Sequence, residues 1–152
     1  MSEACLWRIS QFEDLSGIGG TMVPGRWHHK GRPIVYLGDC PALCLLEILV
    51  HLEDAADELP DAFTLLRAAL PAKEVAKAPT VELSASWRAD LQITRQIGDE
   101  WLEAGESLLL RVPSAIVPHN VNYLFNPLHP AAEQVELSSE SFPADPRLFA
   151  PF

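Results

Sequence analysis

Apolar residues along this chain fall into short runs separated by glycine, proline and acidic residues. Runs rich in branched and aromatic side chains predict β-strands at residues 6–9, 35–37, 62–70 and 108–112. Shorter extended stretches predict further strands at residues 121–130, 135–137 and 147–149. Several neighbouring strands follow one another without a helix between them. The pattern therefore favours an α+β fold, with twisted, mainly antiparallel sheets and a few helices, over a doubly wound parallel sheet.

Two stretches have the pattern of helices. Mainly apolar side chains recur at helical spacing across residues 91–101, and Gly105 is placed to end that helix. A second helix is predicted over residues 41–51, where Pro41 suits the first turn because its missing N–H is not needed there. Apart from its last residue, this helix is apolar at every position except Glu47. A helix that is hydrophobic all round is typical of a protein interior.

The helix at residues 41–51 closes a unit that begins at a GRW tripeptide and is predicted as strand, tight turn, strand and helix. It carries one carboxylate, that of Glu47, into the interior. Burying an unpaired carboxylate costs roughly several kcal/mol, so Glu47 needs a partner or a function. Arg26 is the nearest cation in the unit, and His51 lies on the same helix face. Two interpretations stand: a structural pair of Glu47 with Arg26 or Arg8, and an acid that meets a cationic ligand or a ribose hydroxyl.

Four further side chains are candidates for the same site, and each also has a simpler interpretation. Arg26 lies between a glycine and a tryptophan, where its guanidinium suits a phosphate or stacks on Trp27. Tyr36 suits the core with its hydroxyl at the rim, and Ser114 suits a turn after a proline. His51 suits the end of a helix, where a basic side chain is favourable. The prediction of a site therefore depends on the whole set.

Glycines are dense between the first two predicted strands, at residues 17, 19, 20, 25 and 31. Such density predicts an ordered loop that lets the backbone approach a ligand closely, or else a flexible surface loop. It is not the dinucleotide-binding GxGxxG motif, because no strand–turn–helix frames it. Residues 53–60 are rich in acidic side chains and predict a solvated connection.

The chain has 152 residues, of which 48% are hydrophobic and 21% charged, a balance that suits one domain over residues 1–152. Its net charge of −10 argues against direct nucleic-acid binding, which needs clustered Lys and Arg. No signal peptide or membrane span is visible, and the three cysteines form no disulfide framework, so we expect a cytoplasmic protein. Cys40 and Cys44 lack a second Cys/His pair, so we expect no metal.

Six short motifs occur in order: GRW with Arg26, VYLG with Tyr36, LLEILVH with Glu47, QIGDEWL at residues 96–102, VPSAIVP with Ser114 and NYLFNPLHP at residues 122–130. Together they resemble the RES domain, a family named for an arginine, a glutamate and a serine, over nearly the whole chain. RES proteins are toxins of bacterial toxin–antitoxin pairs, and their fold is similar to NAD-dependent ADP-ribosyltransferases of the diphtheria-toxin kind. The family commonly has Asn after the "RW", where this chain has His28.

The resemblance implies an enzyme that uses NAD as its substrate and needs no metal. Its catalytic residues would be Arg26, Tyr36, Glu47 and Ser114, and its NAD-binding residues would be Arg26, Tyr36, His51, Ser114 and Asn126. Arg26 would hold the pyrophosphate and Tyr36 would stack on the nicotinamide ring. Glu47 would stabilise the positive charge that develops on the ribose as the nicotinamide bond breaks, and Ser114 would bind a phosphate or the amide.

The resemblance also implies partners. A cognate antitoxin would cover the active site, and a target protein would accept ADP-ribose; phosphate or water as acceptor would give phosphorolysis or hydrolysis instead. The sequence leaves the acceptor open, together with the participation of Arg8, His28 and Asn122. A function of another class also stays open: a nucleotide-binding or protein-interaction module without turnover, in which Glu47 and Arg26 form a structural pair.

Overall fold

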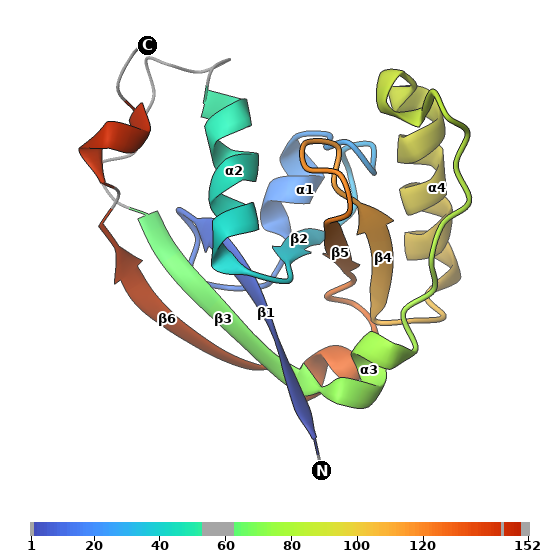
Figure 1. Cartoon of the computed structure of the whole chain (residues 1–152). Helices are drawn as coiled ribbons and strands as arrows, with labels where there is room; N and C mark the ends of the chain where they lie inside the picture. The colour runs from blue at the N-terminus through green and yellow to red at the C-terminus, as the bar shows by residue number, and fades with distance from the viewer. Residues whose placement is uncertain (1, 53–62, 144, 150–152) are drawn as a thin grey trace.

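The computed structural model describes residues 2–52, 63–143 and 145–149, and Figure 1 shows the arrangement of their elements. Six strands form one sheet in the order β4-β5-β2-β1-β3-β6, and each neighbouring pair is antiparallel. The strands are β1 Glu3–Ser10, β2 Val35–Gly38, β3 Phe63–Pro71, β4 Leu109–Pro113, β5 Val121–Phe125 and β6 Glu136–Phe142. The predicted α+β fold with a mainly antiparallel sheet is confirmed.

Helices accompany the sheet on either side of its middle strands. The α-helices are α1 Ile18–Met22, α2 Pro41–Leu52, α3 Ala72–Ala76 and α4 Leu91–Ala104, and the 3₁₀ helices are η1 Trp87–Ala89, η2 Pro130–Gln134 and η3 Pro146–Phe149. Figure 1 shows α2 over the region where β1 meets β2, and α4 beyond β4. Of the helices that the structure describes, none is long and apolar enough to cross a membrane.

The sheet is weakly joined between β1 and β2. Strand β1 pairs with β3 along its whole length, and β2 pairs with β5 over all four of its residues. Between β1 and β2 the described register holds one pair, Trp7 with Gly38. The two strands then diverge, so side chains from both can line a cleft between them.

Apolar side chains pack on both faces of the sheet, because successive residues of a strand point to opposite faces. One face carries Val35 and Leu37 of β2 together with apolar residues of β1, β3, β4 and β5. The other face carries three buried tryptophans, Trp27, Trp87 and Trp101, which pack against β4 and β5. The tryptophan cluster joins the GRW turn, η1 and α4 to the same side of the sheet.

Helix α4 has the ends that the sequence predicts and packs tightly on the GRW turn. The side chain of Asp90 accepts a hydrogen bond from the backbone N–H of Ile93, and Gly105 ends the helix with a φ of 62°, a left-handed conformation that suits glycine. Gly98 lies on the buried face against the backbone of Trp27. A Cβ at Gly98 would overlap the Trp27 carbonyl oxygen, so the glycine of the QIGDEWL motif allows this approach.

Two of the predicted strands are not formed in the described residues. Residues 147–149 lie in η3, whose start is fixed by a hydrogen bond from the backbone N–H of Arg147 to the carboxylate of Asp145. At the GRW motif a tight turn, closed by the N–H of Gly25 and the carbonyl of His28, stands in place of a strand. In both places local hydrogen bonds replace those that a neighbouring strand would supply.

Three other predictions differ in extent, one of them the strand at residues 135–137, which runs over Glu136–Phe142 as β6. Strand β5 ends at Phe125, because the side chain of Asn126 accepts a hydrogen bond from the N–H of Leu128 and begins a turn. Residues 18–22 form α1 within the segment predicted as a loop, entered through Gly17 at a φ of 74°. The acidic connection predicted at residues 53–60 lies outside the described residues.

Gly98→Ala should destabilise the protein, because the added Cβ pushes α4 away from the Trp27 backbone. We expect the free energy of unfolding to fall by about 1–3 kcal/mol, the range for overpacking a filled core, seen as a lower Tm. Gly19→Ala is the matched control, since it adds a Cβ in a helix where the nearest atom outside the local backbone is 3.9 Å away. Equal Tm values for the two variants would contradict the close approach.

Candidate active site

Two pockets meet where β1 and β2 diverge. The first has a volume of about 240 Å³ and is lined by side chains of β1, β2, β5 and α2, including Arg8. The second has a volume of about 160 Å³ and lies between the GRW turn, with Arg26, and the end of β4. Tyr36, Glu47 and Asn122 line both pockets. The cleft therefore has one arginine in each half and a carboxylate where the halves join.

Helix α2 places Glu47 at the surface of the cleft and not in the interior. The prediction of a fully buried helix is wrong, because α2 covers the sheet with one face only. The side chains of Leu46 and Val50 are 41% and 46% exposed, and Glu47 itself is half-buried. The hydrophobic pattern did not reveal this arrangement, because the outer face of α2 is apolar although it is exposed.

The carboxylate of Glu47 is held through one of its two oxygens. Its Oε1 accepts a hydrogen bond from Oγ of Ser114 at 3.2 Å and another from Nδ2 of Asn122 at 2.9 Å. Its Oε2 accepts no hydrogen bond from the described residues. Because no buried side-chain oxygen among those residues lacks a partner, Oε2 is not buried and is open to the cleft. The ion pairs of the described residues do not join Glu47 to Arg26 or Arg8, and the structural pair is not formed.

Ser114 is 1% exposed and its hydroxyl is fully used. Its Oγ donates to Glu47 and accepts hydrogen bonds from the backbone N–H groups of Ile116 and Val117, both at 3.1 Å. A hydroxyl has one hydrogen to donate and two lone pairs. Ser114 thus organises a turn and anchors the carboxylate at the same time, and it has no hydrogen-bonding capacity left for a ligand.

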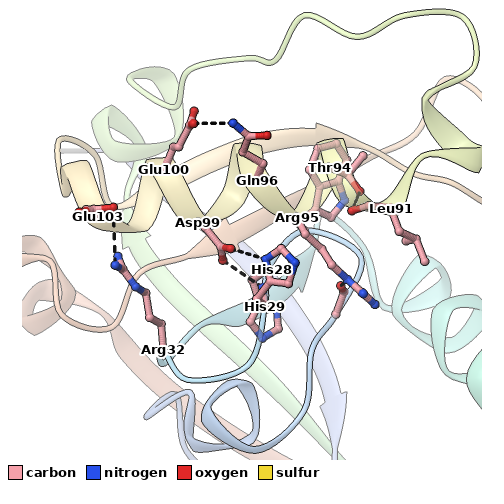
Figure 2. Close-up of polar contacts among 12 residues, drawn as sticks. His28, His29, Arg32, Leu91, Thr94, Arg95, Gln96, Asp99, Glu100 and Glu103 are labelled. Atoms are coloured by element: carbon pink, nitrogen blue, oxygen red, sulfur yellow. Dashed lines mark hydrogen bonds and ion pairs between the residues drawn. The ribbon is translucent and has the colours of Figure 1, made fainter.

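The backbone that carries Arg26 is fixed by α4, and Figure 2 shows three of the α4 residues that face this turn, Thr94, Arg95 and Asp99. Oγ1 of Thr94 donates to the carbonyl of Arg26 at 2.6 Å, and Nε of Arg95 donates to the carbonyl of the preceding glycine at 2.8 Å. The carboxylate of Asp99 accepts from the backbone N–H of His29 at 3.0 Å and pairs with the ring Nδ1 at 2.6 Å. Helix α4 therefore sets the position of the arginine in the second pocket.

The guanidinium of Arg26 is oriented by η1. Its Nη1 donates to the carbonyl of Arg88 at 3.1 Å, and its Cζ lies 5.8 Å from the ring centre of Trp87. The aromatic neighbour is thus Trp87 and not Trp27, which is buried beneath the turn. A guanidinium has five N–H donors, so most of those on Arg26 stay available to an anion.

A chain of hydrogen bonds fixes the ring of Tyr36. Its hydroxyl accepts from the backbone N–H of Trp27 at 3.1 Å and lies 2.6 Å from Nδ1 of His28. The other ring nitrogen of His28, Nε2, lies 3.1 Å from the carbonyl of Gly20. Because a carbonyl can only accept, Nε2 carries the hydrogen, and Nδ1 accepts from the tyrosine hydroxyl.

Burial acts on the pKa values of both members of this pair. It raises the pKa of Tyr36 above its ordinary value, so the hydroxyl keeps its hydrogen. It lowers the pKa of His28, against an opposing effect of the carbonyls of Gly20 and Val23. His28 is 2% exposed, and its neutral form is the one that can accept from Tyr36.

Arg8 lies in the first pocket without a polar partner in the described part of the chain. Neither the hydrogen bonds nor the ion pairs of the described residues involve its guanidinium, and burial lowers its pKa. An arginine stays charged even so. A half-buried cation in the pocket that Glu47 also lines is suited to bind an anion.

Of the predicted NAD-binding residues, Asn126 is not brought into the cleft, and the side chain of His51 is not among those that the structure describes. Asn126 is buried in the turn after β5 and lines neither pocket. The backbone of His51 belongs to α2, but its side chain lies outside the described part of the structure.

Cys44 does line the first pocket; burial raises the pKa of its thiol to about 12, and the thiol donates to the carbonyl of Trp7. It is therefore a poor nucleophile.

Comparisons with known proteins agree with the motifs. A sequence profile described as the RES domain matches residues 5–146. A Pseudomonas putida protein named Toxin Res is 47% identical over 144 residues, covering 95% of this chain and 99% of that protein. A Sphingobium protein named Prs ADP-ribosylating toxin is 34% identical over 141 residues, covering 86% of each.

Among solved structures, the crystal structure of the M. tuberculosis MbcT-MbcA toxin-antitoxin complex contains a similar chain. The TM-score is 0.71 at 18% identity, and the alignment covers 97% of this chain and 87% of that chain. This likeness shows the α+β fold. The profile match and the sequence relatives show the family as well: the chain belongs to the RES domain family, and the resemblance seen in the sequence is confirmed.

Asn122 contacts Glu47 and Arg8 lines the same pocket, two residues whose participation the sequence left open. Arg8 had a signal, because it is the one charged residue in an otherwise apolar stretch at residues 6–9. Asn122 had a weaker one, as the first residue of the NYLFNPLHP motif. The hydrogen bond between residues 47 and 122 joins a helix to a strand far along the chain, and no local pattern predicts it.

His28→Asn should change how stability depends on pH. Because burial lowers the pKa of His28 in the fold below the unfolded value of about 6.5, its stabilising effect is present above that pH. It is lost as the pH falls from about 6.5 toward the lowered pKa. An asparagine oxygen can accept from Tyr36 without titrating, so the Tm of wild type should fall relative to the variant between pH 7.5 and 5.

The control for this comparison is His119→Asn, which makes the same change at an exposed residue. At a φ of 70°, position 119 tolerates asparagine well. This control should keep the wild-type dependence of Tm on pH. Parallel curves for wild type and His28→Asn would show that His28 is not the neutral acceptor described.

Proposed function

We propose that this chain is the toxin of a bacterial toxin–antitoxin pair, acts in the cytoplasm, and cleaves the bond between nicotinamide and ribose in NAD. The observation that carries the proposal is the state of Glu47, with one carboxylate oxygen anchored and the other open to a cleft between two arginines. Family membership supports it, since relatives are named toxins and one is named an ADP-ribosylating toxin. The unit is one RES domain over residues 1–152.

In this proposal the carboxylate acts on a developing cation. Loss of nicotinamide leaves positive charge on the ribose, as in glycoside cleavage through an oxocarbenium-like state. The open oxygen of Glu47 stabilises that charge and holds a ribose hydroxyl, and a fixed group serves this role better than solvent because it needs no reorganisation. Cys44 supplies no competing nucleophile, since its thiol stays protonated.

The other cleft residues bind the two ends of NAD. Arg26 and Arg8 are the cations available for the pyrophosphate, because both have guanidinium donors free. The ring of Tyr36 stacks on nicotinamide, since its hydroxyl is already committed to Trp27 and His28. Ser114 serves through Glu47 and not by contact with a phosphate, because its hydroxyl is saturated.

The proposed reaction also needs an acceptor for the ADP-ribose. A relative named Prs ADP-ribosylating toxin favours a protein side chain, which makes this chain an ADP-ribosyltransferase. NAD labelled on the adenine side, incubated with cell extract and with or without phosphate, separates the outcomes. Label on a protein supports transfer to a protein, label in a phosphorylated sugar nucleotide supports phosphorolysis, and free ADP-ribose supports hydrolysis.

The partner in this proposal is an antitoxin that covers the cleft. A solved structure of similar fold is a toxin–antitoxin complex, and the cleft offers Arg26, Tyr36 and Glu47 to an inserted segment. A segment that ends in a carboxylate suits Arg26, which would receive it in place of a phosphate. The net charge of −10 leaves DNA binding in the operon to the antitoxin.

The alternative function, a nucleotide-binding module without turnover, required a structural pair between Glu47 and Arg26. The described residues hold no such ion pair. Nicotinamide release measured on the wild-type protein decides between the two functions. Binding of NAD without release would support the passive module.

Glu47→Gln should lower kcat for nicotinamide release at least ~100-fold, the order of effect for removing a preorganised electrostatic group. A glutamine oxygen can still accept from Ser114 and Asn122, so the Tm should change little. The same variant should relieve the growth arrest that wild-type expression causes in bacteria. Glu106→Gln, at an exposed residue, is the control and should release nicotinamide at the wild-type rate; an active Glu47→Gln protein would refute the mechanism.

Arg8→Lys and Arg26→Lys keep the charge but lose the two-pronged geometry that suits a pyrophosphate. We expect each to weaken the binding free energy for NAD by about 1–3 kcal/mol, the range for a charge-assisted hydrogen bond. This corresponds to a rise in KM of roughly 5- to 150-fold. Arg67→Lys, at an exposed residue of β3, should leave KM unchanged. If one arginine variant keeps the wild-type KM, the other arginine holds the pyrophosphate alone; if both do, neither does.

A further inference from the structure

Asn122 is the second donor to the carboxylate of Glu47, and nothing in the motif that contains it assigns it a role. Its Nδ2 lies 2.9 Å from Oε1 of Glu47, closer than Oγ of Ser114 at 3.2 Å. A carboxylate oxygen accepts and does not donate, so the amide nitrogen of Asn122 must be the atom that faces it. The contact joins β5, an inner strand of the sheet next to the edge strand β4, to α2.

Asn122 can reach Glu47 because the residue opposite it on β2 is a glycine, Gly38. In the register of the sheet, Asn122 lies opposite Gly38 of β2 and opposite Val112 of β4. A Cβ at Gly38 would be 2.7 Å from Sγ of Cys44 and 3.7 Å from Oδ1 of Asn122. Glycine at this position therefore lets α2 settle close to β2 and puts Glu47 within reach of β5.

We propose that Asn122 is a positioning residue, which, together with Ser114, directs Oε2 of Glu47 toward the substrate; the inference rests on the proposed cleavage of NAD. Two donors on one oxygen restrict rotation of the carboxylate about its terminal bond. They also leave Oε2 as the oxygen that meets the ribose. Without Asn122 the carboxylate keeps its charge but loses its fixed direction, and small losses of geometry near the reacting atoms cost large factors in rate.

Asn122 also lines both pockets, so a direct contact with the ligand must be told apart from action through Glu47. A residue that acts through Glu47 changes kcat and leaves KM almost unchanged, because the substrate itself loses no partner. A residue that binds NAD directly changes KM. The two roles therefore predict different kinetic parameters for the same substitution.

The first test is Asn122→Leu, which keeps the size of the side chain and removes the donor. We expect kcat for nicotinamide release to fall about 10- to 100-fold with KM within about threefold of wild type. A folded Asn122→Leu protein with the wild-type kcat would overturn the proposal. A raised KM at unchanged kcat would replace it with direct ligand binding.

The second test is Asn122→Asp, which places a carboxylate against that of Glu47. Other ionisable groups line the cleft: Arg8 of β1, Arg26 of the GRW turn, Tyr36 of β2 and Cys44 of α2. Among the described residues, the one hydrogen bond of the Asn122 side chain goes to Glu47. Two carboxylates in contact cannot both ionise easily, so in this variant the pair holds one shared proton, and the pKa of that proton lies well above the ordinary range for a carboxylic acid.

This variant should be nearly inactive at pH 8 and regain activity as the pH falls, because the shared proton restores a donor to Oε1. Wild type should show no such recovery. The matched control is Asn120→Asp, the same change two residues earlier, where the side chain donates to the carbonyl of Pro118; it should keep the wild-type pH profile. A wild-type profile for Asn122→Asp would overturn the proposal.

Thermal unfolding separates failure of this inference from failure of the proposed function. If wild type releases no nicotinamide, the proposed function fails, but the contact can still be measured. The Tm of Asn122→Asp should then fall relative to that of Asn120→Asp as the pH rises from about 4 to 8, because the carboxylates repel once both are ionised. Parallel Tm curves for these two variants would refute the contact itself.

Discussion

The half-buried carboxylate of Glu47 is the constraint on which the rest of the site depends. A charged group at that depth needs donors, and it finds two on a single oxygen, from Ser114 after β4 and from Asn122 on β5. The chain meets the requirement with Gly38, which lets α2 lie close to the sheet. Strands β1 and β2 also separate beyond their single pair, and this opens the space that the second carboxylate oxygen faces.

A second constraint is the precision with which the GRW turn is held. A turn of this length has few contacts of its own, so its arginine would otherwise move freely. Helix α4 removes that freedom: Gly98 allows its backbone to touch the turn, and Thr94, Arg95 and Asp99 bind the turn's polar groups (Figure 2). The QIGDEWL motif thus supports the site from outside through Gly98 and Asp99, since within the described residues none of its side chains lines either pocket.

Much of the fold was predictable because it follows local rules. The 3.6-residue period and the glycine at 105 predicted α4, and branched residues predicted β1, β2, β3 and β4. Predictions failed where local hydrogen bonds or one-sided burial decided the outcome. The carboxylate of Asp145 turned residues 147–149 into η3, and α2 keeps Leu46 and Val50 exposed although its composition suits an interior.

The sequence by itself determined the fold class, the family and the identity of Glu47 as the unusual charge, because periodicity, composition and ordered motifs are properties of neighbouring residues. Only the tertiary structure decided which groups hold that charge. Of the two interpretations left open, it excluded the structural pair of Glu47 with Arg26 or Arg8 within the described residues, gave the carboxylate Ser114 and Asn122 as donors, brought Arg8 into the cleft and left Asn126 in a turn. The contacts of Glu47 with Ser114 and Asn122 join residues tens of positions apart, and their geometry is set by strand register and helix packing, which no local pattern contains.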